Sequence, residues 1–199
     1  MKQIVASLVF AAVALFGFSA GAQTSLSAEP HFPLESWQRR GDANAQKFNG
    51  EFVKRLTSVF PVSVLPCLTK LANQGAPIRV ETYASGELRS DVDAKSCSNQ
   101  PMPNTGQVIT DRVSISGDRL AALALVVERF EHEPFFAGNN RDLSLYDFTI
   151  SVSKGIAAIN LDPGPQHSTI AGCPKTGTVN ATYFVNLKTY TVQLGRMVC

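Results

Sequence analysis

The residues best suited to chemistry stand together in the stretch FEHEPFF, where Glu131, His132 and Glu133 are adjacent. An imidazole with carboxylates can bind a metal or act as a general acid and base. Neighbouring residues point to opposite faces of a strand and fan out by about 100° on a helix, so these three converge only at an irregular bend, which Pro134 could supply. The spacing therefore favours a solvated polar segment. An enzyme that uses Glu131 and His132 with a distant carboxylate such as Asp162 is the alternative.

The next stretch, PFFAGNNRD, has the composition of a binding loop. Two phenylalanines follow a proline and precede Gly-Asn-Asn-Arg, and aromatic and arginine side chains anchor many protein interfaces. The candidate binding residues are therefore Phe135, Phe136, Asn139, Asn140 and Arg141. In the alternative, the two phenylalanines lie under the loop in the core.

Motifs for common catalytic and cofactor sites do not occur in this sequence. It has no G-x-S-x-G, no P-loop and no dinucleotide-binding glycine pattern, and its four cysteines do not follow a zinc spacing. The formal net charge is only +2, and adjacent basic residues such as Arg39 and Arg40 form no large cluster of the kind that binds nucleic acid. We predict no catalytic residue, cofactor, metal or nucleic-acid partner.

The N-terminal residues predict export. An apolar run over residues 4–18 follows a lysine and ends before Ala20-Gly21-Ala22, the small-x-small pattern of signal-peptide cleavage. This run is shorter than the ~20 apolar residues of a spanning helix. We expect a periplasmic or secreted protein without stable membrane insertion after cleavage, and an uncleaved anchor is the alternative. The predicted boundaries are a signal peptide over 1–22, a leader or linker over 23–34 and a single domain over 35–199.

Four cysteines in an exported chain indicate disulfides, and four cysteines allow three pairings. We predict the bridges Cys67–Cys97 and Cys173–Cys199. Each closes a loop of roughly 30 residues, for which the chain-entropy model gives about 3–4 kcal/mol. The first bridge would tie a helix to the β-structure, and the second would close the open end of the last hairpin.

Apolar periodicity predicts two helices near the mature N-terminus. Phe48, Phe52, Leu56 and Phe60 share one helical face, in a helix that begins near residue 42 or 44 and stops at Pro61. A second, shorter helix is predicted over 66–73, with Cys67 in its first turn.

Residues 119–132 satisfy two patterns. Gly117-Asp118 is a hairpin signal that would place Ile115 opposite Leu120 and begin a long central strand. The residue types also favour a helix, with a passable apolar stripe through Leu120 and Phe130. We favour the strand, and the helix is the alternative.

Two hairpins are predicted from alternation on either side of a turn. The first pairs Val152 with Ala157, Ile150 with Ile159 and Phe148 with Leu161. The C-terminal one pairs Val185 with Tyr190, Tyr183 with Val192 and Ala181 with Leu194, which sets Cys199 opposite Thr176, close to Cys173.

Together these features predict an α+β fold, with an N-terminal helix pair packed on an antiparallel sheet of hairpins and stabilised by disulfides. The expected function is that of an exported, non-catalytic protein that binds another protein or an envelope component, as an inhibitor, immunity or accessory protein does. A small secreted hydrolase or metal-dependent enzyme and a structural subunit of an envelope assembly are the alternatives.

Overall fold

The computed structural model describes residues 44–133, 141–163 and 180–198. The chain divides into two units, Met1–Phe32 and Pro33–Cys199, and all described residues belong to the second. The predicted signal peptide, the linker and the Cys173–Cys199 bridge lie outside the described residues. They therefore stay predictions.

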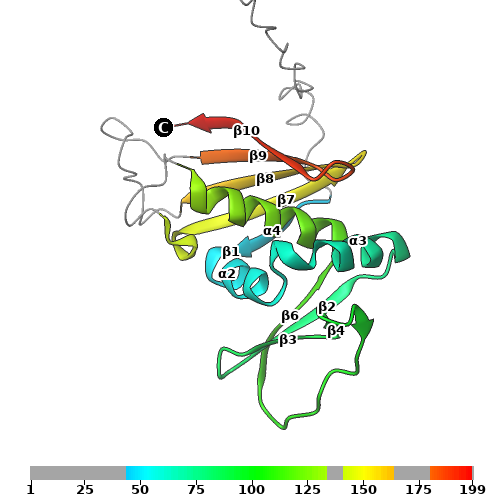
Figure 1. Cartoon of the computed structure of the whole chain (residues 1–199). Helices are drawn as coiled ribbons and strands as arrows, with labels where there is room; N and C mark the ends of the chain where they lie inside the picture. The colour runs from blue at the N-terminus through cyan, green and yellow to red at the C-terminus, as the bar shows by residue number, and fades with distance from the viewer. Residues whose placement is uncertain (1–43, 134–140, 164–179, 199) are drawn as a thin grey trace, which may run out of the picture. The chain divides into compact units, whose positions relative to one another are not determined.

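The described chain has a mixed α+β fold with antiparallel sheets, as predicted (Figure 1). Its helices are α2 (Gly50–Val59), α3 (Leu65–Gln74) and α4 (Gly117–His132), with short 3-10 turns η1 (Val62–Val64) and η3 (Leu143–Leu145). The strands are divided among three sheets, so the single sheet that we expected is wrong. The five-stranded sheet has the order β1 (Gln46–Asn49), β7 (Tyr146–Ser153), β8 (Ile156–Pro163), β9 (Asn180–Asn186), β10 (Thr191–Val198). The smaller sheets are β3 (Leu88–Ser90), β2 (Ile78–Tyr83), β6 (Ile109–Ile115), and the pair β4 (Val92–Asp93), β5 (Ser98–Asn99).

The first helix begins later than predicted. Asn49 caps α2, because its Oδ1 accepts the backbone N–H of Phe52 at 2.7 Å. The residues before it form strand β1, where Phe48 pairs with Phe148 of β7. The ring of Phe48 still stacks on that of Phe52 at 5.5 Å between centroids, so a strand followed by a helix buries the same apolar side chains that a longer helix would have buried.

The second helix and its bridge are confirmed. Helix α3 ends at Gly75, which has a left-handed φ of 71° as expected for a C-terminal glycine. Cys67 lies in its first turn and is joined to Cys97 with a Cα–Cα distance of 5.2 Å. The predicted disulfide therefore links α3 to the turn between β4 and β5.

The preference for a strand over residues 119–132 was wrong, because this segment is helix α4. Ser116 caps it by accepting the N–H of Arg119. Gly117 does not form a hairpin turn; it lets α4 approach α3, since a Cβ there would lie 2.7 Å from the Leu68 carbonyl oxygen. Buried residues lie on nearly every side of α4. Its apolar positions therefore fit the alternation of a strand as well as the periodicity of a helix.

The hairpin β7–β8 has the register that we predicted, with all three cross-strand pairs confirmed. The C-terminal register is wrong: Val185 lies opposite Val192, where Tyr190 was predicted, and a bulge follows between Leu194 and Arg196. The turn is longer than expected because Asn186 organises it. The Asn186 side-chain Oδ1 accepts the N–H of Lys188 at 2.9 Å, and the Asn186 backbone carbonyl accepts the N–H of Tyr190, whose φ is 57°.

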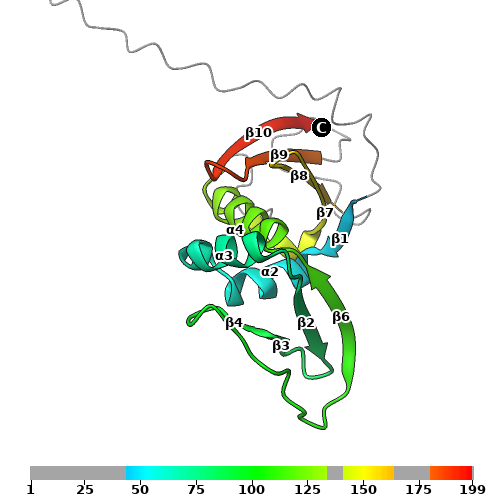
Figure 2. The same ribbon diagram turned by 90° about the vertical axis from the view of Figure 1, so that its right-hand side faces the viewer.

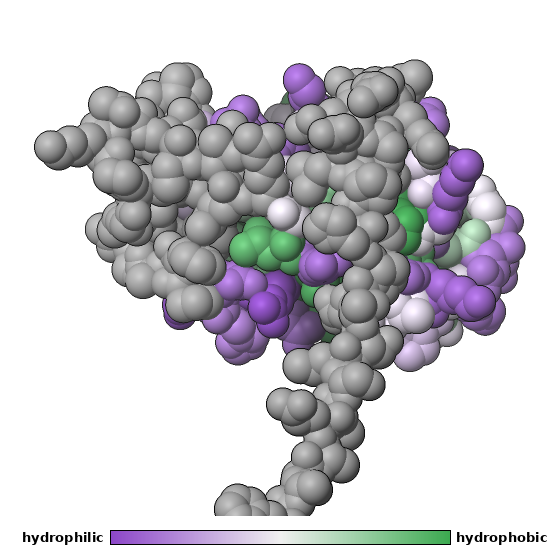
Figure 3. Space-filling model, turned by 90° about the horizontal axis from the view of Figure 1, so that it is seen from above, coloured by the Kyte–Doolittle hydropathy of each residue, from purple (hydrophilic) through white to green (hydrophobic). Residues whose placement is uncertain are grey.

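Helix α4 lies along one face of the five-stranded sheet and also contacts α3 (Figures 1 and 2). Its buried side chains belong to one hydrophobic core with those of β7, β8 and β9. In the view of Figure 3, hydrophilic residues cover more of the described surface than hydrophobic ones do. Within the described ranges no single helix is long and apolar enough to cross a membrane; one bent pair, Gly50–Val59 with Val62–Gln74 at 52°, passes on length and composition alone.

Candidate functional site

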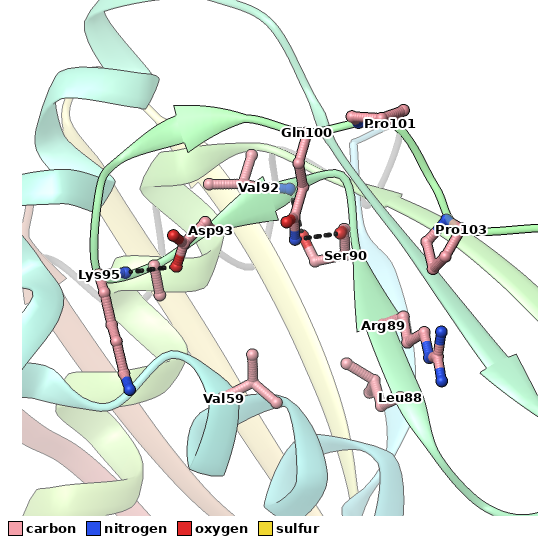
Figure 4. A pocket seen from close by; sticks show the side chains of 11 residues that line it. Val59, Leu88, Arg89, Ser90, Val92, Asp93, Lys95, Gln100, Pro101 and Pro103 are labelled. Atoms are coloured by element: carbon pink, nitrogen blue, oxygen red, sulfur yellow. Dashed lines mark hydrogen bonds between the residues drawn. The ribbon is translucent and has the colours of Figure 1, made fainter.

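A groove of about 470 Å³ lies at the C-terminal end of α2, beside strand β3 and the β4–β5 turn (Figure 4). Its volume is within the range of ~300–1,000 Å³ that is usual for ligand sites. More than half of its lining residues are apolar: Val59, Leu88, Val92, Ala94, Pro101 and Pro103.

Val59 is an exposed apolar residue in the groove. It is 37% exposed, and Val108 is the other large hydrophobic residue that is exposed in the described part of the chain. Leu88 beside it packs partly against the core. Isolated exposed apolar residues are common, and Val59 is one that lies inside a groove.

The β4–β5 turn forms one wall of the groove, and three kinds of bond hold it. Asp93 accepts the N–H of Lys95 at 2.9 Å and the hydroxyl of Ser96 at 2.7 Å, and these bonds, the hydroxyl first, lower the pKa of the Asp93 carboxyl. The N–H of Cys97 donates to the Asp93 carbonyl at 2.8 Å, and Cys97 is then joined to Cys67 of α3. Strands of two residues are marginal by themselves, so we attribute the order of this wall mainly to the disulfide.

Two basic side chains flank the apolar part of the groove. Arg89 donates to Glu87 at 2.8 Å, which lowers the pKa of the Glu87 carboxyl, and it also lies over the Tyr83 ring at 5.5 Å. The ion pairs between described residues do not include Lys95. Figure 4 shows Lys95 and Arg89 on opposite sides of Val59. The ammonium of Lys95 lies in the same groove as the Asp93 carboxylate, whose pKa its charge helps to lower.

The predicted binding loop is only partly described. Arg141 is described and exposed, whereas Phe135, Phe136, Asn139 and Asn140 lie outside the described residues. The structure therefore does not test whether these five residues form a site.

The residues of the enzyme alternative do not form a cluster in the part of the chain that the structure describes. Glu131 and His132 are exposed at the end of α4, and Asp162 is exposed in β8. Within the described ranges no group of three His, Cys, Asp or Glu side chains is placed to hold a metal.

A buried polar cluster at the end of α4 was not anticipated from the sequence. Glu133 is 4% exposed and accepts the guanidinium of Arg129 at 2.7 Å. The hydroxyl of Tyr183 is fully buried without a hydrogen bond to any described residue, and burial, followed by the charge of Glu133, raises the pKa of this phenol. The ion pair with Arg129 neutralises the buried carboxylate of Glu133.

The groove was not predicted from the sequence, although some of the residues that form it are noticeable there. Pro101 and Pro103 stand close together in the sequence, and Cys97 was predicted only as half of a bridge. Comparisons with protein-family models, curated proteins and solved structures found no match.

Proposed function

We propose that the chain is an exported, non-catalytic protein that binds another protein through the groove between α2 and β3. The single observation that carries this proposal is a groove that contains the exposed Val59 and whose wall is tethered covalently by Cys67–Cys97. A surface held rigid before binding loses less conformational entropy when a partner docks. Inhibitor, immunity and accessory proteins of the cell envelope act by such binding.

Two features support the exported location. Disulfides such as Cys67–Cys97 are found mainly in proteins of oxidising compartments, of which the periplasm is one. The N-terminal residues 1–22 have the pattern of a signal peptide. We infer that this peptide is removed and that the single domain over 35–199 is the active form.

We also infer that the helix pair α2 and α3 packs on the five-stranded sheet and so supports the groove from behind. The stacking of Phe48 in β1 on Phe52 in α2 favours this arrangement. The shared core, which contains Leu56 of α2, Leu68 of α3 and Ile150 of β7, also favours it.

The proposal is tested by placing a charge in the groove. Val59→Arg changes an exposed residue, and Val108→Arg changes the other exposed valine as the matched control. Immobilised proteins are used to capture partners from an envelope extract, and the captured proteins are identified by mass spectrometry. We expect the same partner with wild type and Val108→Arg and its loss with Val59→Arg. A partner retained by Val59→Arg would refute binding in the groove.

The aromatic loop stays a second candidate for the same function. In the sequence, Phe135 and Phe136 follow Glu133, the C-terminal cap of α4, after Pro134. The variant Phe135→Ala/Phe136→Ala, in the same capture experiment, distinguishes the two surfaces. If it loses the partner that Val59→Arg retains, the binding surface is the loop.

A further inference from the structure

The five-stranded sheet has a second face, opposite helix α4. Successive side chains of a strand point to opposite faces of its sheet. Ile159 and Tyr183 belong to the core that the sheet shares with α4. Their neighbours in sequence, Ala158 and Phe184, therefore point the other way, to what we call the outer face. Figure 2 shows the three described helices on the concave side of the sheet, so the outer face is the convex one.

Two apolar side chains on the outer face are nevertheless buried. Ala158 is 5% exposed, and Phe184, which lies opposite it on β9, is 2% exposed. Gly195 of β10 lies against one side of the Phe184 ring, because a Cβ at Gly195 would overlap that ring. The core formed by the described side chains includes neither Ala158 nor Phe184. Since a fully buried side chain touches about 6–12 other residues, another segment of the chain must cover the ring from outside.

The chain enters the sheet in line with these two residues. Gln46, the first residue of β1, lies opposite Ile150 of the antiparallel strand β7. The residue before Gln46 is therefore on the side of Ser151. Ser151 begins a row that runs across the sheet through Ala158 to Phe184. The segment that precedes β1 thus reaches the sheet at one end of the row that has to be covered.

Residues 33–43 are long enough to cross to Phe184. They belong to the same compact unit as the sheet, since this unit begins at Pro33. Strands β1 and β9 are three strand spacings apart, or about 14 Å at ~4.8 Å each. Trp37, the single tryptophan of the sequence, precedes Gln46 by nine residues, and an extended chain of that length spans up to ~30 Å.

Two other segments outside the described residues fit the outer face less well. Residues 134–140 follow the end of α4, which lies on the concave side. Residues 164–179 join β8 to β9 and contain no Phe, Tyr or Trp. Aromatic rings pair favourably in offset or edge-to-face arrangements. Trp37 is therefore the better cover for the ring of Phe184.

We infer that residues 33–43 cross the outer face of the five-stranded sheet as a strap, with the indole of Trp37 over Phe184 and Ala158. The strap encloses this face, so the face is not available to a partner protein. It shares no residue with the groove, so its failure would leave the proposed function untouched.

The test uses the full exported chain, in which Trp37 reports on its own surroundings. NMR measures nuclear Overhauser contacts from the indole to the Phe184 ring and the Ala158 methyl group. Acrylamide quenching of the tryptophan fluorescence is measured in the native and the urea-unfolded chain. The variant Ala158→Arg places a long charged side chain under the strap. Asp147→Arg, at an exposed position on the outer face of β7, is the matched control.

We expect indole contacts with Phe184 and Ala158 in wild type, and quenching several-fold weaker in the native than in the unfolded chain. Ala158→Arg should lose the contact with Phe184 and should be quenched nearly as strongly as the unfolded chain. Asp147→Arg should behave as wild type. The amide of Phe148, whose side chain is in the core, should exchange equally slowly in both variants if the sheet is intact. If Ala158→Arg does not fold, the contacts in wild type decide alone.

Four results would overturn the inference. Native quenching equal to that of the unfolded chain would mean that Trp37 is uncovered. Equal quenching in Ala158→Arg and wild type would mean that Trp37 is buried elsewhere. Contacts of Phe184 with residues 164–179 in place of Trp37 would assign the cover to that segment. Contacts seen only between differently labelled chains would assign it to a second copy.

Discussion

Removing the Cys67–Cys97 bridge tests whether the disulfide holds the wall of the groove. The variant Cys67→Ala/Cys97→Ala removes both sulfur atoms. Alanine suits the first position better than serine, because Cys67 is 9% exposed and a buried hydroxyl would need a hydrogen-bond partner.

The expected loss of stability follows from the length of the loop. The bridged residues are 30 apart in sequence. The chain-entropy relation then gives about 12 cal/mol/K for the unfolded chain, or about 3.6 kcal/mol near 25 °C. Since domains have unfolding free energies of ~5–15 kcal/mol, we expect the variant to fold but to unfold at lower denaturant concentration.

Loss of the bridge should speed amide exchange more at the β4–β5 pair than in the rest of the fold. The Gln100 N–H, which donates to the Asp91 carbonyl at 2.8 Å, should exchange at least about tenfold faster in the variant. The amide of Phe148, in strand β7 between β1 and β8, serves as the internal control. Urea unfolding and amide exchange by NMR provide the two measurements.

Two results would refute this reasoning. One is an unfolding free energy within ~1 kcal/mol of wild type, which would mean that the bridge does not restrict the unfolded chain as the loop entropy requires. The other is unchanged exchange at Gln100, which would mean that the wall is ordered by its hydrogen bonds alone.

Three further predictions concern the core. Tyr183→Phe should raise the unfolding free energy in urea by about 1 kcal/mol, because it removes a buried hydroxyl without a described partner; a decrease would contradict this account. Gly117→Ala should lower the free energy of unfolding by about 1–3 kcal/mol, and the melting temperature with it, because its Cβ would lie 2.7 Å from the Leu68 carbonyl oxygen. An unchanged melting temperature would count against the close approach of α4 and α3. Burial raises the pKa of Tyr146 to about 12, above its unfolded value of about 10, so its contribution to stability is complete below pH ~10 and is lost as the pH rises from ~10 to ~12. The stability of Tyr146→Phe, measured by unfolding at alkaline pH, should therefore fall less between pH ~10 and ~12 than that of wild type. An identical fall in both proteins would show that ionisation of Tyr146 does not cause it.

The elements that depend on neighbouring residues were predictable from the sequence. Helix α3 has its proline near the start and Gly75 at its end, and the β7–β8 register follows from alternation around a short turn. In both cases the contacts that decide the structure lie close together in the chain, so the local pattern contains the required information.

Elements that depend on distant contacts were not predictable. The sequence of α4 fits a buried strand as well as a buried helix. Its capping by Ser116, together with the contact of Gly117 with Leu68 on α3, accompanies the helical form. The β9–β10 register also differs from the prediction, because Asn186 and Tyr190 form a longer turn. A shift of this kind keeps the same side chains on the same face, so the apolar pattern could not reveal it.

The sequence by itself determined an α+β chain with its first bridge and with two prolines at residues 101 and 103. Only the tertiary structure decided that these prolines line one groove together with Val59 of α2 and Leu88 of β3. The physical reason is that α2, β3 and the segment after β5 are separate stretches of the chain. Which separate stretches pack against one another is set by tertiary contacts that no local sequence pattern contains.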